Sequence, residues 1–181
     1  MSAIALVRPL PVLSPKGVAL PTFQTGWAAY ERGDYAIAYI AWRPLAEQRH
    51  AEACYHLGTL YDEGKGVRAD AGKAFKWYRR AARYGYVIAH AQLGAMYWHG
   101  DGVARHFAQA LQHYRTGAEQ GDALAAYFLG VLYLEGRPAR LHDPGIPRDR
   151  ALALHWFEQA AAAGFIYAQH KLATLRARGL L

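Results

Sequence analysis

The sequence has few of the residues that build disulfide frameworks, metal centres or membrane spans. Its 181 residues include a single cysteine, Cys54, which excludes an internal disulfide framework and a multi-cysteine zinc site. No window approaches the roughly 18 consecutive apolar residues of a membrane-spanning helix. The formal charge of +7 permits acidic partners, but the basic residues are scattered along the chain and identify none.

The first 21 residues have little capacity to form a helix, because four prolines interrupt each apolar run. These are Pro9, Pro11, Pro15 and Pro21. The segment is also a poor signal peptide, since it lacks a basic start and its apolar run from Ala3 to Val7 is short. We therefore predict a cytoplasmic protein with a proline-rich arm over residues 1–21. That arm is either a flexible terminus or a segment that packs on the rest of the chain or on a partner.

What the sequence does contain is a repeat with a step of 36 residues. The first copy carries Ala53, Leu57, Gly58, Tyr61, Gly64, Gly66, Val67, Ala74, Tyr78, Ala82 and Gly85. The same residue types return at the same step from Ala89 to Gly121, and a third copy begins at Ala125. A fixed period of this size indicates a solenoid, in which each unit mainly contacts its neighbours.

Each copy is predicted to form two helices joined by a glycine-rich loop. In the first helix, Ala53, Leu57, Leu60 and Tyr61 share one stripe, and Gly64 closes it. The predicted core face of the second helix is Ala74, Trp77, Tyr78, Ala81 and Ala82. A glycine inside a helix costs about 1 kcal/mol against alanine. The return of Gly58 at positions 94 and 130 therefore predicts that another helix approaches closely there.

The two motifs of this repeat resemble the Sel-1-like repeat of bacterial proteins, a relative of the tetratricopeptide repeat. They are A-x-x-x-L-G-x-x-Y-x-x-G-x-G-V and K-A-x-x-W-Y-x-x-A-A-x-x-G. Residues 53–88 match nearly throughout, residues 89–124 have His113 in the place of Trp77, and residues 125–167 match at both ends. The resemblance implies an all-α, right-handed superhelix of antiparallel helix pairs that holds other proteins. It implies neither an enzyme nor a cofactor.

Three segments flank or interrupt the regular repeats. Residues 22–52 are predicted to be a degenerate helix pair, in which Thr22 and Asp34 cap the helices and Pro44 bends the second one. Residues 168–181 are predicted to be a capping helix. The third repeat is longer than the others and carries a proline-containing, basic loop over residues 137–148. This insertion is either a tolerated surface loop or a semi-rigid finger for an acidic partner.

The predicted binding surface lies on the first helices of the three repeats, at positions that point away from the neighbouring units. In the third repeat these positions are almost wholly apolar, which a solvated surface does not need. Either the loop or the arm covers them, or they form a hot spot for a partner helix or peptide. The predicted contact residues are Tyr55, Trp98, Tyr127, Phe128, Val131, Leu134, Arg137 and Arg140.

Candidates for catalysis or metal binding are weak. His99, His106 and His113 recur every seven residues, but the spacing crosses a loop and no acidic ligand accompanies them. Cys54 and His56 point to different faces of one helix, so we expect Cys54 to be a small half-buried side chain. We therefore predict a non-catalytic protein without a metal, a cofactor or a small-molecule substrate.

Nucleic-acid binding is the remaining alternative. The second helix of the first repeat carries Lys73, Lys76, Arg79, Arg80 and Arg83. The aromatic residues beside them are predicted core positions and would not be free to stack on bases, so these charges are interpreted as a solvated outer face. The leading hypothesis is a scaffold or adaptor that binds a partner protein on its concave face. The second is a structural subunit of a larger assembly, and nucleic-acid binding through the basic helix comes last.

Overall fold

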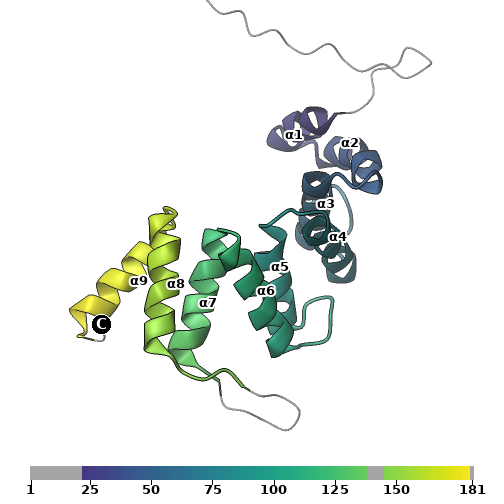
Figure 1. Cartoon of the computed structure of the whole chain (residues 1–181). Helices are drawn as coiled ribbons and strands as arrows, with labels where there is room; N and C mark the ends of the chain where they lie inside the picture. The colour runs from purple at the N-terminus through teal and green to yellow at the C-terminus, as the bar shows by residue number, and fades with distance from the viewer. Residues whose placement is uncertain (1–21, 138–144, 180–181) are drawn as a thin grey trace, which may run out of the picture.

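The computed structural model describes residues 22–137 and 145–179, and these ranges contain nine α-helices and one isolated β-bridge. The helices are α1 (Phe23–Glu31), α2 (Tyr35–Glu47), α3 (Ala51–Glu63), α4 (Ala71–Arg83), α5 (Ala89–His99), α6 (Phe107–Glu119), α7 (Ala123–Glu135), α8 (Arg150–Ala162) and α9 (Ile166–Ala177). They follow one another as the pairs α1–α2, α3–α4, α5–α6 and α7–α8, with α9 at the end (Figure 1). The predicted all-α solenoid is confirmed. No described helix has the length and apolar character that crossing a membrane requires.

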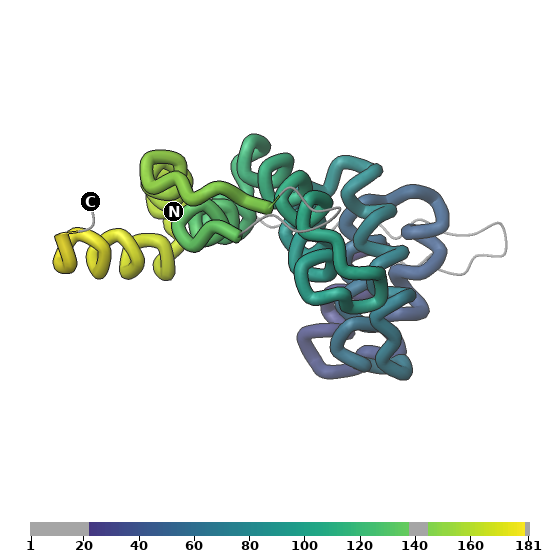
Figure 2. Tube along the Cα trace, turned by 90° about the horizontal axis from the view of Figure 1, so that it is seen from below, coloured from purple at the N-terminus to yellow at the C-terminus, as the bar shows by residue number. Residues whose placement is uncertain are grey.

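The units form a curved row in which α1 and α9 lie at opposite ends (Figure 1). Figure 2 shows the same order from below, from the helix pair α1–α2 to α9 at the far end. Each helix packs mainly on the helices before and after it in the chain, and α5 also contacts α7 directly. Contacts of this kind make neighbouring units depend on each other while distant units do not touch.

The helix caps follow the sequence signals with one exception. The Thr22 hydroxyl accepts a hydrogen bond from the Thr25 amide, and Asp70 caps α4 in the same way through the Lys73 amide. Asp34 stands at the predicted cap of α2, but its side chain makes no capping bond. Its carboxylate instead accepts a hydrogen bond from Arg32 Nε at 3.2 Å, because this ion pair draws it away from the helix end.

The recurring helix glycines lie where an aromatic ring crosses the helix. A Cβ atom at Gly58 would stand 2.7 Å from the ring of Tyr78. At Gly94 it would stand 2.7 Å from Tyr114, and at Gly130 it would stand 2.8 Å from Phe157. In each unit the second helix thus places a ring against the glycine of the first, and the predicted close approach is confirmed.

The burial of Trp77 and Cys54 differs from the prediction. Trp77 is half-buried, whereas its neighbour Phe75 is only 7% exposed because the next unit places Tyr97 against it, with ring centroids 5.3 Å apart. Cys54 was expected to be half-buried but is fully buried, and its thiol donates to the Ala46 carbonyl at 3.5 Å. The packing of α2 on α3 closes over this side chain.

Candidate binding surfaces

Five of the predicted contact residues belong to one hydrophobic cluster, which joins the helices from α5 to α9. Trp98 lies near the end of α5, and Tyr127, Phe128, Val131 and Leu134 lie on α7. All five are half-buried and pack against the same core, so each keeps part of its surface exposed. We call these five residues the α5–α7 surface. Tyr55 is not part of it: its ring lies 4.9 Å from Tyr86, in the cluster of the preceding units.

The loop inserted in the third repeat is anchored beside the α5–α7 surface. Arg137 and Ile146 form the β-bridge at its base, and the Ile146 side chain is buried. The Arg137 guanidinium lies 3.5 Å above the ring centroid of Phe107, and that ring meets Trp98 edge to face at 4.8 Å. The base of the loop therefore covers one edge of the surface. Arg140 lies outside the described residues, as does the arm over residues 1–21.

The predicted histidine series is not brought together, but one of its members forms a different pair. His106 caps α6 and His99 is exposed at the end of α5. His113 is half-buried, and its Nδ1 lies 3.0 Å from Nδ1 of His90. Within residues 22–137 and 145–179, no group of three histidine, cysteine or acidic side chains is arranged to hold a metal ion. Because one ring of the pair must accept the hydrogen bond, it has to be neutral.

Burial sets the protonation of these rings. Desolvation lowers the pKa of His113 to about 4, and the neighbouring His90 adds to the effect. Desolvation likewise lowers the pKa of His56 to about 4, where its ring stacks on Trp42 at 4.9 Å. Both rings are therefore neutral at pH 7 and resist protonation while the protein is folded.

Acidification is expected to destabilise the protein through His56 and His113. Their pKa in the unfolded chain is about 6.5, so the unfolded state takes up protons first as the pH falls. The stabilising contribution is complete above about pH 6.5 and is lost between pH 6.5 and about 4. With allowance for partial exposure, each ring should contribute about 1–2 kcal/mol to this loss.

Urea unfolding at pH 7 and pH 4.5, for the wild type and for His56→Gln/His113→Gln, would measure the effect. The double variant should lose clearly less stability on acidification than the wild type. The comparison between variants is needed because the raised pKa of Asp62 and Asp122, which comes from burial, acts in the opposite direction. An equal loss in both proteins would contradict the assignment to the two histidines.

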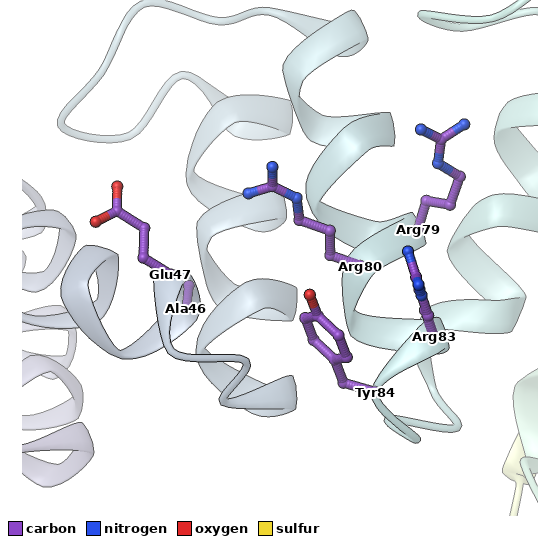
Figure 3. A pocket seen from close by; sticks show the side chains of 6 residues that line it. All are labelled: Ala46, Glu47, Arg79, Arg80, Arg83 and Tyr84. Carbon is purple, nitrogen blue, oxygen red and sulfur yellow. The ribbon is translucent and has the colours of Figure 1, made fainter.

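A basic pocket opens between the ends of α2 and α4, with a volume of about 480 Å³. Arg79, Arg80 and Arg83 line it from α4, together with Tyr84 at the end of that helix. Ala46 and Glu47 line it from α2. Figure 3 shows the Arg80 side chain pointing toward the α2 side of the pocket while the Glu47 carboxylate points away from α4, with the ring of Tyr84 between Ala46 and Arg83. We call this space the arginine pocket.

A second, aromatic pocket of about 310 Å³ lies near the start of the array. Phe23, Gln24 and Trp27 of α1 line it, with Glu52 and His56 of α3. Tyr86, which precedes α5, completes the wall. It therefore combines side chains from the first helix pair and from the repeat that follows it.

Sequence patterns did not reveal either pocket or the partner of Trp98. The arginines were recognised as a charged helix face, but the residues of α2 that close the arginine pocket are more than 30 positions away. Phe107 carried no signal, because its spacing to Trp98 crosses a loop. The one sequence feature that pointed to these contacts was the high density of aromatic residues between Phe23 and Tyr61 and between Trp98 and Phe128.

The architecture defines this molecule as a helical-repeat solenoid in which hydrophobic clusters and pockets are built across successive units. The family model described as Sel1 repeat matches three stretches of it, residues 51–86, 87–122 and 123–165. These matches cover more than half of the chain, which therefore belongs to the Sel1 repeat family. Proteins of this family are generally non-catalytic interaction scaffolds.

Solved structures agree with this assignment. A Sel1 repeat protein from Oxalobacter formigenes is 35% identical and superposes with a TM-score of 0.75, covering 84% of this chain and 60% of its own. A protective antigen of uropathogenic Escherichia coli strains that displays an SLR fold is 29% identical, with a TM-score of 0.70. It covers 84% of this chain and 32% of its own.

Among curated proteins, similarity extends to an exopolysaccharide production negative regulator of Rhizobium leguminosarum bv. viciae. The two sequences are 36% identical over 63 residues, which are 35% of this chain and 24% of the regulator. The chain thus spans about a quarter of this relative, and 60% of the Oxalobacter structure.

Proposed function

We propose that this protein is a scaffold that holds a segment of a partner protein against the α5–α7 surface. The partner would contact Trp98, Tyr127, Phe128, Val131 and Leu134, and the basic loop with Arg137 and Arg140 would border the site. Tyr55, predicted as a further contact, would meet only a partner long enough to reach the preceding unit. The similarity to a bacterial regulator of exopolysaccharide production supports a regulatory role for the scaffold itself.

The observation that carries this proposal is the apolar character of α7. Over Ala123–Glu135 the helix has a single charged residue, at its last position. The buried residues of α7 face the core. Tyr127, Phe128, Val131 and Leu134 are only half-buried, so part of each side chain is exposed. In α3 the residues at the positions of Val131 and Leu134 are Thr59 and Asp62, so the repeat itself does not require apolar side chains there.

Polar substitution on this surface is expected to abolish partner binding while the fold is retained. We expect Val131→Ser/Leu134→Ser to lower recovery of a stoichiometric partner by about tenfold or more in a tagged pull-down from native cell extract, since hot-spot residues typically contribute 2 kcal/mol or more. Trp98→Ala provides a second test at the other end of the surface. Circular dichroism and the midpoint of thermal unfolding would verify that each variant is folded.

The matched control is Ile166→Ser/Tyr167→Ser, which removes two apolar side chains that are 56% and 65% exposed on α9. This variant should retain the partner. Loss of the partner in the control but not in Val131→Ser/Leu134→Ser would reject the α5–α7 surface.

A structural role in a larger assembly is the second candidate, and the exposed face of α9 favours it. Ile166 and Tyr167 point to solvent at the end of the array, where another repeat or subunit would cover them. In that case the control variant above, and not the α5–α7 variant, would release the associated protein.

A further inference from the structure

The arginine pocket collects positive charge that the fold itself does not neutralise. Successive basic residues of α4 are three positions apart, except for the adjacent Arg79 and Arg80, and this spacing places all five on one side of the helix. They are Lys73, Lys76, Arg79, Arg80 and Arg83, and all are exposed. Two of them lie in the last turn of α4, where positive charge is favourable to the helix dipole by about 0.3–1 kcal/mol. The helix dipole explains why positive charge is favourable at Arg80 and Arg83. It does not explain why three arginines line one pocket.

The nearby acidic side chains are engaged with other cations. Glu47, which lines the pocket, pairs with Arg43 at 3.1 Å. Asp70 pairs with Lys73 at 3.4 Å. Within the two described ranges, no carboxylate lies at ion-pair distance from the guanidinium group of Arg79, Arg80 or Arg83. Three arginines therefore line the pocket without a carboxylate partner among the described residues.

Two of these guanidinium groups are held by aromatic rings. Arg80 Cζ lies 4.6 Å from the ring centroid of Trp77, and Arg79 Cζ lies 5.7 Å from that of Phe75. A guanidinium that lies over a ring keeps its N–H donors available at the edge of its plane, and the contact reduces the entropy lost when an anion binds. The half-buried position of Trp77, unexpected from the repeat, thus supports the side chain of Arg80.

We propose that the arginine pocket binds a glutamate- or aspartate-bearing segment of a partner protein. Planar carboxylates fit the paired donors of arginine, and a pocket of about 480 Å³ accommodates more than one acidic side chain. The Tyr84 hydroxyl lines the same space and adds a further hydrogen-bond donor. This site is separate from the α5–α7 surface, so the two proposals can fail independently.

An acidic peptide fits these observations better than a nucleic acid does. The basic stripe is confined to α4, and its ten-residue span is about 15 Å long. The second helix of the next unit, α6, carries only Arg115 and Glu119 as charged residues. Within α4, Tyr78 is buried and Trp77 lies under Arg80, so neither ring is free to stack on bases.

Glu47 provides a substitution with the opposite expected sign. Its carboxylate lines the pocket and would repel an acidic ligand, although it is screened by Arg43. Removing this charge should therefore strengthen binding, whereas removing the arginines should weaken it. A pair of variants with opposite effects distinguishes a local site from a general dependence on the charge of the protein.

The test is fluorescence anisotropy on the full chain with fluorescein-labelled octaglutamate as the probe, and with octaglutamine and a twelve-nucleotide oligothymidylate for comparison. Arg80→Gln/Arg83→Gln should weaken octaglutamate binding by about tenfold, and Glu47→Gln should strengthen it by about twofold to fivefold. The matched controls Arg150→Gln/Arg178→Gln and Glu119→Gln change the net charge equally at exposed positions elsewhere. Each control should change the binding free energy of octaglutamate by less than half as much as the pocket variant that has the same change in net charge.

A third variant, Arg80→Lys/Arg83→Lys, keeps the charge and the helix-end interaction but removes the guanidinium donors. It should bind octaglutamate with intermediate affinity, and it keeps the test valid if the glutamine variant unfolds. Equal effects of the pocket and control variants, or no binding of octaglutamate, would overturn the proposal. Oligothymidylate binding that depends on the same arginines while octaglutamate does not bind would overturn it in favour of nucleic acid.

Discussion

Replacing Gly102 with alanine is expected to lower the free energy of unfolding by about 3–5 kcal/mol, one of the largest effects of any small substitution in this chain. Gly102 has a φ of +67°, and a Cβ atom there would lie 2.2 Å from the carbonyl oxygen of Ala71. That oxygen belongs to the start of α4, in the preceding unit. Backbone atoms cannot move aside as a flexible side chain would, so the loop and the helix would have to separate.

The matched control is Gly121→Ala. Gly121 has a φ of +90°, but a Cβ atom there meets nothing within 4 Å. This variant therefore carries only the strain of the left-handed conformation, about 1–2 kcal/mol. Urea unfolding followed by circular dichroism would measure both. If the two variants lost the same stability, the contact between the units would not be the reason for glycine at position 102.

The same contact occurs one unit earlier. A Cβ atom at Gly66 would lie 2.5 Å from the carbonyl carbon of Tyr35, at the start of α2. In two successive units, then, the second glycine of the loop rests on the first turn of the preceding unit's second helix. This glycine joins units, whereas the helix glycine at position 58 or 94 allows two helices within one unit to approach. The sequence predicted the close helix approach at Gly58 and a glycine-rich loop, but not that the second loop glycine contacts the preceding unit.

Truncation of Trp42 is expected to have a comparable effect, confined to one end of the array. Trp42 is fully buried, its Nε1 donates to the Phe23 carbonyl at 3.1 Å, and its ring fills the space over Gly26. Trp42→Ala should cost about 3–5 kcal/mol. Because units contact mainly their neighbours, the loss should appear as faster hydrogen exchange in α1, α2 and α3 and should be small in α7, α8 and α9.

Trp77→Ala is the matched control, since it removes the same ring from a half-buried position. It should cost about 1–2 kcal/mol, in proportion to the smaller apolar area that it buries. Hydrogen exchange measured by mass spectrometry on both variants would separate the local from the global effect. A uniform increase of exchange along the whole chain in Trp42→Ala would show that the array unfolds as a single unit.

The binding surfaces show where prediction from the sequence ends. The positions of Val131 and Leu134 on one helix followed from the period, because residues of one helix keep a fixed relation. The stacking of Arg137 on Phe107 did not, since it joins a loop base to the preceding unit. Tyr55 was grouped with Trp98 because both occupy outward positions of their repeats, yet the structure places it in another cluster.

The sequence by itself determined the helix pairs, the loops between them and their order in a row, because each depends on interactions within about 36 residues that the repeat reproduces. Tertiary structure alone decided which side chains of different units meet. The ends of α2 and α4 close the arginine pocket, and Arg137 lies over the Phe107 ring of the preceding unit. Such contacts depend on how the non-repeated side chains pack between units. Because these side chains differ from one repeat to the next, the repeat pattern does not predict their contacts.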